Sequence, residues 1–431
     1  MLALSRLSPY ALAAPDIRRR ETELARISGR LERALAPETA LALRQALAGI
    51  NGYYSNLIEG ASTEPIEAEL ALTTDRPENS DPQYDALLAQ ARAGIIASLS
   101  MDEALRDPAN DPLSPEMIRF AHFVFCSNIS SAALEVRGSD GRSSRVIPGQ
   151  FRDEHVRVGE HIAPAPEDVP ELISALPAFI GVHGPTIAAA MLAHHRLCWI
   201  HPFLDGNGRA VRLITDGLLH RTGAGGAGLW SLSRGLARNS GEYKSMLRHA
   251  DAAPRGPYDG RGALSMKASE DFVRFMLDVA LDQASFMDQR LSLRSMARRV
   301  ERLCGDRADL MNRDERAAPV LLQAMVAGRV RRGDVAGLVG LSERRARDIT
   351  RECLIDGLLV SPSEKGELQA GFPMWAMASL FPNLFPIDDP HAAMMEAVNV
   401  SESKPLSSSL PLVRAGVRRS IEAGSAILLK Q

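Results

Sequence analysis

The sequence predicts a mainly α-helical protein whose helical core carries one small β-hairpin and is followed by a second, smaller unit. Only 5% of the 431 residues are aromatic, whereas Ala, Leu and Arg are abundant, and this composition favours helices over sheets. Apolar residues also recur at helical spacing, as at Leu24, Ile27, Leu31 and Leu35. The length predicts two or three domains.

Five stretches before residue 312 carry this helical spacing, and the first of them is interrupted near Pro37 because proline cannot continue a helix. They lie at 16–50, 102–136, 168–200, 208–221 and 270–303. Between Val136 and Pro164 the pattern changes, and glycines flank short alternating pieces such as Phe151 to Val158. This pattern predicts a loop and a small hairpin.

A second unit begins near Asn312. Helical patterns at 314–328 and 333–340 are followed by Ser342, a good N-cap, and by a third helix to about Asp356. Two short strand patterns follow, joined by a turn at Lys365-Gly366. Three helices and a hairpin resemble a winged helix-turn-helix. We therefore divide the chain into an N-terminal helical region, a helical core, a winged-helix-like domain and an unassigned tail, at 1–100, 101–305, 310–385 and 386–431.

Charge and apolar patterning exclude several classes of protein. The formal net charge of −3 argues against a protein that coats nucleic acid or membrane as a whole. No apolar run approaches the ~18 residues of a membrane span. The N-terminal apolar stretch is short and is broken by Arg6 and Pro9, so no signal peptide is expected. The sequence predicts a cytoplasmic protein with no membrane partner.

The most informative segment is residues 201–212, His-Pro-Phe-Leu-Asp-Gly-Asn-Gly-Arg-Ala-Val-Arg. It lies between two predicted helices, and its last residues open the second one. Gly206, Asn207 and Gly208 allow the backbone to approach a ligand closely. Exposed amides at a helix N-terminus also attract anions. The segment therefore predicts a backbone anion site.

The charged side chains of this segment point to a nucleotide. Arg209 and Arg212 share one face of the second helix, and two guanidinium groups beside an anion site suit a polyphosphate. Asp205 offers the hard oxygen that Mg²⁺ prefers when it bridges phosphates. His201 stands at the start of the loop and can act as a base near neutral pH. Each residue alone has an ordinary structural explanation, whereas their joint occurrence is specific.

The segment resembles the Fic motif, H-P-F-x-[D/E]-G-N-G-R-x-x-R, at every fixed position. Residues 148–164 resemble the family's hairpin flap, which holds the target protein beside the site. Asn239 and Tyr243 resemble later positions that contact the nucleoside. The resemblance covers roughly residues 50–300, and it implies a helical Fic catalytic core at 101–305 with the hairpin as its flap.

In this family the reaction moves AMP from ATP to a hydroxyl group of a target protein. The resemblance implies that His201 deprotonates the hydroxyl of a Ser, Thr or Tyr side chain. It also implies that Asp205 holds Mg²⁺ between the α- and β-phosphates of ATP. The protein would then be a magnesium-dependent protein adenylyltransferase with ATP as co-substrate.

The remaining motif residues are implied to bind and stabilise the triphosphate. The amides around Gly206 to Gly208, with Asn207, would stabilise the charge on the transferred phosphoryl group. Arg209 and Arg212 would bind the β- and γ-phosphates. Doc-like kinases of the family carry Lys where this chain has Gly208, so the sequence favours AMP transfer over phosphate transfer.

A second motif lies upstream, where residues 55–60 read Ser-Asn-Leu-Ile-Glu-Gly. This resembles the family's inhibitory motif, [S/T]-x-x-x-E-[G/N], with Ser55 and Glu59 on one helix face. The resemblance implies that Glu59 occupies Arg212 and denies it to the γ-phosphate. The alternative is a surface glutamate at a helix end, with Gly60 as the C-cap.

Two other functions stay open at this stage. The first is a DNA-binding regulator whose core senses nucleotide or modifies its own chain, because arginines crowd residues 329–351 and DNA contact through 329–372 would follow. The second is removal of AMP, which the same glutamate sometimes supports in this family. Self-modification and homodimer formation are open partner interactions.

Overall fold

The computed structural model describes most of the chain, including the two motifs at residues 55–60 and 201–212. The described residues are 14–61, 63–73, 81–138, 141, 143–183, 186–259, 263–386, 394 and 409–428. The predicted absence of a signal peptide concerns residues 1–13, which lie outside this set. Within it, no helix has the length and apolarity that crossing a bilayer requires.

The fold is mainly helical, as the composition predicted, with three short two-stranded sheets. The N-terminal and central helices are α1 (Pro15–Leu31), α2 (Pro37–Ile58), α3 (Pro65–Thr73), α4 (Pro82–Ala104), α5 (Pro115–Cys126), α6 (Val169–His183), α7 (Ile187–Ile200), α8 (Asn207–Arg221), α9 (Leu232–Arg238), α10 (Ser240–Ala250) and α11 (Met266–Arg290). Those that follow are α12 (Leu293–Met311), α13 (Ala318–Ala327), α14 (Val335–Val339), α15 (Glu343–Ile355), α16 (Met374–Leu380) and α18 (Ser409–Leu428).

Each sheet is one antiparallel hairpin. The pairs are β1 (Glu135–Arg137) with β2 (Ser143–Arg145), β3 (Arg157–Val158) with β4 (His161–Ile162), and β5 (Leu359–Val360) with β6 (Gln369–Ala370). The prediction of a single hairpin before residue 165 was wrong, since both β1–β2 and β3–β4 precede it. Strand β1 is only three residues long and its partner β2, Ser-Ser-Arg, has no apolar residue, so no alternating pattern long enough to recognise was present.

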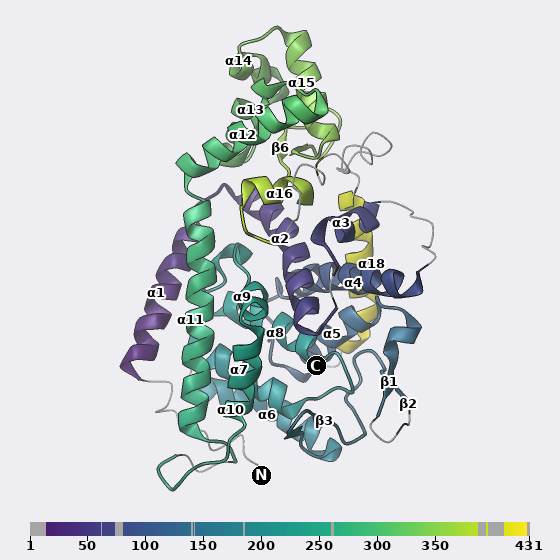
Figure 1. Ribbon diagram of the computed structural model, residues 1–431, viewed down its shortest axis with the longest axis vertical. Helices are drawn as coiled ribbons and strands as arrows, with labels where there is room; N and C mark the ends of the chain where they lie inside the picture. Colours follow the sequence, from purple (N-terminus) through teal and green to yellow (C-terminus); the bar gives the residue numbers. More distant parts are fainter. Residues whose placement is uncertain are drawn as a thin grey trace.

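Helices α7 and α8 lie at the centre of the larger part of the molecule (Figure 1). Helix α5 and α11 pack on them, and α2 packs across α4 and α8. The approach of α2 to α4 is close, because a Cβ at Gly52 would lie 3.2 Å from the backbone of Gly94. Because α2 also contacts α8, residues 55–60 at the C-terminal end of α2 lie close to the helix that follows the 201–206 loop.

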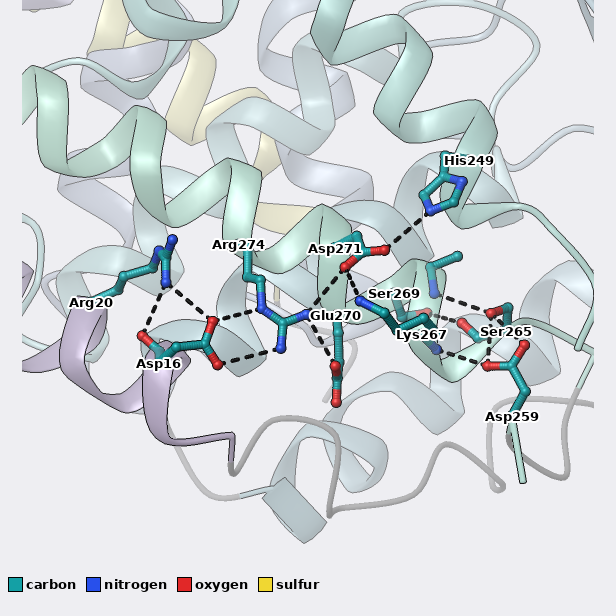
Figure 2. Close-up of polar contacts among 11 residues, drawn as sticks. Asp16, Arg20, His249, Asp259, Ser265, Lys267, Ser269, Glu270, Asp271 and Arg274 are labelled. Carbon is teal, nitrogen blue, oxygen red and sulfur yellow. Dashed lines mark hydrogen bonds and ion pairs between the residues drawn. The ribbon is translucent and has the colours of Figure 1, made fainter.

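Helix α1 is fastened along α11 by charged side chains (Figure 2). Asp16 accepts hydrogen bonds from Arg20 and, at 2.7 Å, from Arg274, and Arg274 also pairs with Glu270. The same helix supports α7, because the Glu21 carboxylate accepts a bond of 2.8 Å from the Ala188 amide. Helix α1 thus contacts both α11 and α7, the helix that leads into the 201–206 loop.

The segment 312–385 forms one end of the molecule in Figure 1, with α13, α14 and α15 followed by the β5–β6 hairpin. This is the order of elements that the sequence predicted, and the winged-helix assignment stays a prediction. The unassigned tail contains α18, a helix that packs on α4 and α5.

A buried ion pair joins α12 to the residue that follows α15. The Arg307 guanidinium and the Asp356 carboxylate are both inaccessible to solvent. Arg313 pairs with the other carboxylate oxygen at 3.2 Å, and the Trp375 indole donates to the Asp356 carbonyl. Two cations therefore depend on one carboxylate.

Replacing Asp356 by alanine should destabilise this end of the molecule by about 3–5 kcal/mol, because Arg307 would remain buried without a counter-charge. Urea unfolding of the full chain measures the change. Asp348→Ala, at an exposed position of α15, is the control and should change stability little. An Asp356→Ala protein as stable as the control would contradict the assignment of this pair as a structural anchor.

Candidate active site

The loop between α7 and α8 is framed by two residues in the left-handed region. His201 ends α7 with φ 48° and ψ 62°, and its amide still donates to the Leu197 carbonyl. Gly206 precedes α8 with φ 78°. A left-handed conformation is uncommon for a residue with a side chain, and such residues cluster at functional sites. The loop geometry therefore singles out His201.

Asn207 holds the loop in shape. Its side-chain oxygen accepts from the Phe203 amide at 2.8 Å, and its side-chain nitrogen donates to the Phe203 carbonyl at 2.7 Å. The side chain is buried. As the first residue of α8, Asn207 also contributes one of the amides that have no partner within the helix. Its direct contact with a phosphoryl group stays a prediction.

His122 of α5 contacts the 201–206 loop through its backbone and through Phe203. The sequence analysis did not identify this residue. Its Nδ1 accepts from the Gly149 amide at 2.9 Å, so its Nε2 carries the proton that is donated to the Asp205 carbonyl at 3.0 Å. The ring stacks on Phe203 with centroids 3.9 Å apart. Burial lowers the pKa of His122 to about 4, so this bridge stays neutral.

Arg152 was also missed, and it joins the flap to the loop. This buried guanidinium donates to the carbonyls of His201 at 2.8 Å, Glu154 at 2.9 Å and Pro164 at 2.6 Å. Arg152 stands beside acidic residues in the sequence, which is typical of a solvated turn. The only signal was its place in the segment that resembles the flap.

The His201 imidazole is suited to accept a proton. Burial is the main reason that its pKa is lowered to about 4, so the ring is neutral at pH 7. Its Nδ1 lies 3.4 Å from the Cys198 carbonyl oxygen. In the tautomer that donates this bond, Nε2 keeps its lone pair. A neutral, oriented imidazole has the properties of a general base.

Arg212 and the inhibitory motif are in direct contact. The guanidinium donates through Nε to the Ser55 hydroxyl at 2.9 Å, and through Nη2 to the Ser55 carbonyl at 2.9 Å and to Glu59 Oε1 at 2.7 Å. Arg212 is only 3% exposed, whereas the Glu59 side chain is 36% exposed. Burial is the largest influence on the pKa of Glu59 and raises it, but the charge and hydrogen bond of Arg212, together with the charges of Arg209 and Lys244, hold that pKa below its usual value.

Glu59 also covers the start of α8. A Cβ placed on Gly208 would lie 2.1 Å from Glu59 Oε1 and 3.1 Å from an Arg212 nitrogen. The carboxylate therefore occupies the space above the first turn of α8, where the free amides would hold a phosphate. Glu59 is also the C-cap of α2, the position at which the alternative had placed Gly60, and Gly60 follows with φ 84°. That Glu59 denies Arg212 to a phosphate stays a prediction.

Arg209 lines the same small pocket as Ser55 and Arg212. It donates to the Gln90 side chain of α4 at 3.0 Å, and its Cζ lies 4.7 Å from the Phe125 ring centroid. Its Nε is buried and has no hydrogen-bond partner among the described residues. Buried donors are nearly always paired, so this one is free for a ligand.

Asp205 is exposed at the mouth of the loop, and Oδ1 accepts from the Gly206 amide at 2.6 Å. No group of three metal-ligating side chains occurs among the described residues. The single exposed carboxylate of Asp205 is a hard oxygen ligand of the kind that Mg²⁺ prefers, and magnesium binding there stays a prediction.

Asn239 and Tyr243, the two predicted nucleoside contacts, differ in burial. Asn239 is exposed between α9 and α10, and its side chain donates to the Gly235 carbonyl. Tyr243 is buried, and its hydroxyl lies 2.7 Å from His194, which in turn contacts Thr215 at 2.8 Å. This chain joins α10, α7 and α8. Contact of either residue with a nucleoside stays a prediction.

The predicted flap contains the β3–β4 hairpin. Its His161 donates to the Trp199 carbonyl at 2.8 Å and pairs with Asp251 at 3.3 Å, and Asp251 also contacts His195 at 3.0 Å. The hairpin exposes the apolar side chains of Val158 and Ile162. It is thus fixed to the end of α7, next to His201, while one face stays open.

Comparison with known proteins gives a consistent family. Residues 112–219 match the model of the Fic/DOC family. The chain is 28% identical over 178 residues to a protein adenylyltransferase Fic of Nematostella vectensis, covering 40% of this chain and 37% of that protein. It is 31% identical over 145 residues to one of Drosophila melanogaster, covering 32% and 30%. The chain thus spans about a third of the length of the curated relatives it matches.

Among solved structures, a Fic family protein from Desulfovibrio desulfuricans G20 aligns with a TM-score of 0.49 at 19% identity, covering 83% of this chain and 96% of that one. A Fic domain containing signaling protein from Bacteroides thetaiotaomicron aligns with a TM-score of 0.46 at 18% identity, covering 63% and 96%.

Proposed function

Since residues 112–219 of this chain form a Fic/DOC family domain, we propose that the protein is an adenylyltransferase that moves AMP from ATP to a Ser, Thr or Tyr hydroxyl of a target protein. The observation that carries the proposal is the loop itself. It places a neutral, strained His201 beside a helix N-terminus, with Arg209 and Arg212 on that helix.

The reaction balances with the groups of this chain. His201 Nε2 takes the proton of the target hydroxyl while the hydroxyl oxygen attacks the α-phosphorus. The bond from the α-phosphorus to the bridging oxygen breaks, and pyrophosphate leaves. Amides at the start of α8 stabilise the charge on the α-phosphoryl oxygens, while Arg209 and Arg212 orient the β- and γ-phosphates. Mg²⁺, held by Asp205, would supply charge neutralisation between the α- and β-phosphates.

Glu59 is proposed as a built-in inhibitor of this reaction. Support comes from its bond to Arg212 and from its position above Gly208. With Glu59 in place, ATP has neither the Arg212 fork nor the space above the first turn of α8. The target would dock on the open face of the flap at 148–164, whose exposed Val158 and Ile162 can contact an extended segment.

ATP labelled on either the α- or the γ-phosphorus tests the type of transfer. The Glu59→Gly protein is incubated with each label, and radioactivity on protein is measured after denaturation. Label from the α-position alone supports AMP transfer to the chain or to an added target. Label from the γ-position would instead show phosphate transfer and overturn the proposal.

Replacing Asp205 by alanine should abolish the dependence of ATP binding on Mg²⁺. Asp205 is exposed and its Oδ1 makes only a local bond to the Gly206 amide, so the loop should survive the change. Nucleotide affinity is measured by calorimetry over a Mg²⁺ titration, with the Glu59→Gly background in both proteins. Exposed Asp153→Ala is the matched control. The same Mg²⁺ dependence in Asp205→Ala and the control would remove Asp205 as the metal ligand.

A second candidate function, DNA binding, is favoured by the surface of α15. Arg344, Arg345, Arg347 and Arg351 of this helix are all exposed. Arg345 pairs with Asp314, whereas no ion-pair partner of Arg344 or Arg351 occurs among the described residues. Unpaired arginines on an exposed helix can contact backbone phosphates.

We expect the full chain to bind duplex DNA weakly and in a salt-sensitive way, since each phosphate contact adds about one unit to the log–log salt slope. Fluorescence anisotropy across a salt series measures this slope. Arg344→Ala/Arg351→Ala should flatten it, while Arg19→Ala, an exposed arginine on distant α1, should not. The absence of binding at low salt would leave α15 as a protein-contact surface.

A further inference from the structure

A cavity of about 530 Å³ lies at the other end of α2, away from the loop. Its walls come from α2, α4, α18 and residues 371–374, which lead into α16. Figure 1 shows α18 beside α4, on which it packs directly. The cavity has the size of a small-molecule site.

The side chains that line the cavity combine an apolar surface with unbalanced positive charge. Leu41, Leu99 and Phe372 contribute the apolar wall. Arg414 and Arg418 of α18, one helical turn apart, also line it, and neither has a hydrogen-bond or ion-pair partner among the described residues. Two unpaired guanidinium groups are matched by an acidic group.

The acidic residues of the cavity are already engaged. Asp102 pairs with Arg44, and Glu103 pairs with Arg106 at 2.7 Å. The Glu69 carboxylate accepts a bond of 2.7 Å from the Met374 amide, and burial raises its pKa to about 7. The charge left over for a ligand is therefore positive.

The cavity is connected to the active site through α2 and Arg44. Helix α2 runs from the cavity to Ser55 without a proline after its first position. Arg44 joins the cavity wall to α8, because its Nη2 contacts both Asp102 of α4 and, at 3.3 Å, the His220 ring. The close contact at Gly52 and Gly94 fixes α2 against α4. A ligand at one end of α2 thus acts on a rigid element whose other end carries Glu59.

We propose that this cavity binds a small organic anion with an apolar body, and that binding strengthens the hold of Glu59 on Arg212. Residues 41–49 of α2 line the cavity, so a shift of α2 on release of Glu59 would change the cavity, and the ligand would then bind the conformation with the Glu59–Arg212 contact more tightly. The inhibitory effect rests on the proposed adenylyltransferase activity, whereas the binding site does not.

Calorimetric titration of the full chain tests the site, with octanoate and phenyl phosphate as anions and octylammonium as the cation of matched size. At least one anion should bind with a Kd below about 1 mM, and octylammonium should not. Arg414→Ala/Arg418→Ala should weaken binding about tenfold or more. Arg419→Ala, exposed on α18 but outside the cavity, should bind as the parent does.

Leu99→Trp, which fills the cavity from α4, should also abolish binding and gives a second variant if loss of the arginines disturbs α18. Failure of both anions to bind, or unchanged affinity in the double arginine variant, would overturn the site.

Two readouts test the effect on Glu59. Hydrogen exchange of the amides of residues 55–61 should slow when the anion binds, and this measurement needs no activity. AMP transfer by the parent protein should fall by up to about tenfold at an anion concentration ten times Kd, while Glu59→Gly should not respond. Binding without slower exchange would contradict the coupling. Slower exchange in a protein that transfers no AMP would leave the site standing and reject the proposed function.

Discussion

Replacing His201 by alanine is expected to lower AMP transfer by about 10²–10⁴-fold, the range that general-base catalysis contributes. The variant is made in the Glu59→Gly background, where activity is high enough to measure the loss. The expected result follows from the place of the imidazole, which stands at the start of the loop that leads into α8 and is neutral at pH 7. ATP affinity should change little, because His201 is not assigned to the phosphates.

The pH profile supplies a second observable for the same residue. Burial lowers the pKa of His201 to about 4, so the base is active above that value and is lost as pH falls through it. The activity of the Glu59→Gly protein should therefore stay nearly level from neutral pH down to about 5. His249→Ala, an exposed histidine on α10 that contacts Asp271, is the matched control. Full activity in His201→Ala, or an acid limb above pH 6, would reject its role as the base.

Replacing Glu59 by glycine is expected to raise AMP transfer on the order of 10²-fold. Arg212 can form a two-bond fork with Glu59 or with the γ-phosphate, but not with both. The carboxylate is tethered to α2 and so has a high effective concentration. Its position above Gly208 also forces the triphosphate out of line, and a displacement of about 1 Å can cost on the order of 10²-fold in rate.

Two further variants separate this explanation from a general loosening of α2. Glu59→Gln keeps the size of the side chain and removes its charge, so it should give an intermediate rate. Glu59→Gly/Arg212→Ala should fall back to low activity, because ATP itself needs the Arg212 fork. Initial rates with α-labelled ATP measure all three. If Glu59→Gly transfers AMP at the parent rate on itself and on candidate targets, the motif is only a helix end.

The sequence predicted those parts of the site in which the chemistry is local. Residues 201–212 contain the candidate base, the candidate metal ligand and both arginines in one short segment, so their proximity follows from the spacing, while their roles stay predictions. The contact between Glu59 and Arg212 joins residues far apart in the chain, and only the family resemblance pointed to it. His122 and Arg152 carried no such signal, because a histidine in an apolar helix and an arginine beside acids have ordinary explanations.

Helices were predicted better than the elements without strong periodicity. The one long amphipathic pattern at 270–303 was correctly helical but is divided between α11 and α12, which are separated by Leu291 and Ser292, whereas β1–β2 and the tail helix α18 were not assigned. Helix α18 is stabilised by packing on α4 and α5, and at Gly424 a Cβ would lie 2.5 Å from the Phe120 ring. Such tertiary contacts decide the structure of segments whose own propensity is weak.

The proposal that the protein is an adenylyltransferase inhibited by Glu59 is tested most directly by intact mass. The purified Glu59→Gly protein is weighed after incubation with ATP and Mg²⁺. The account predicts an added mass equal to one AMP moiety, absent from the same protein carrying His201→Ala and much weaker in the parent. An added mass equal to one phosphate, or equal modification in parent and variant, would contradict it.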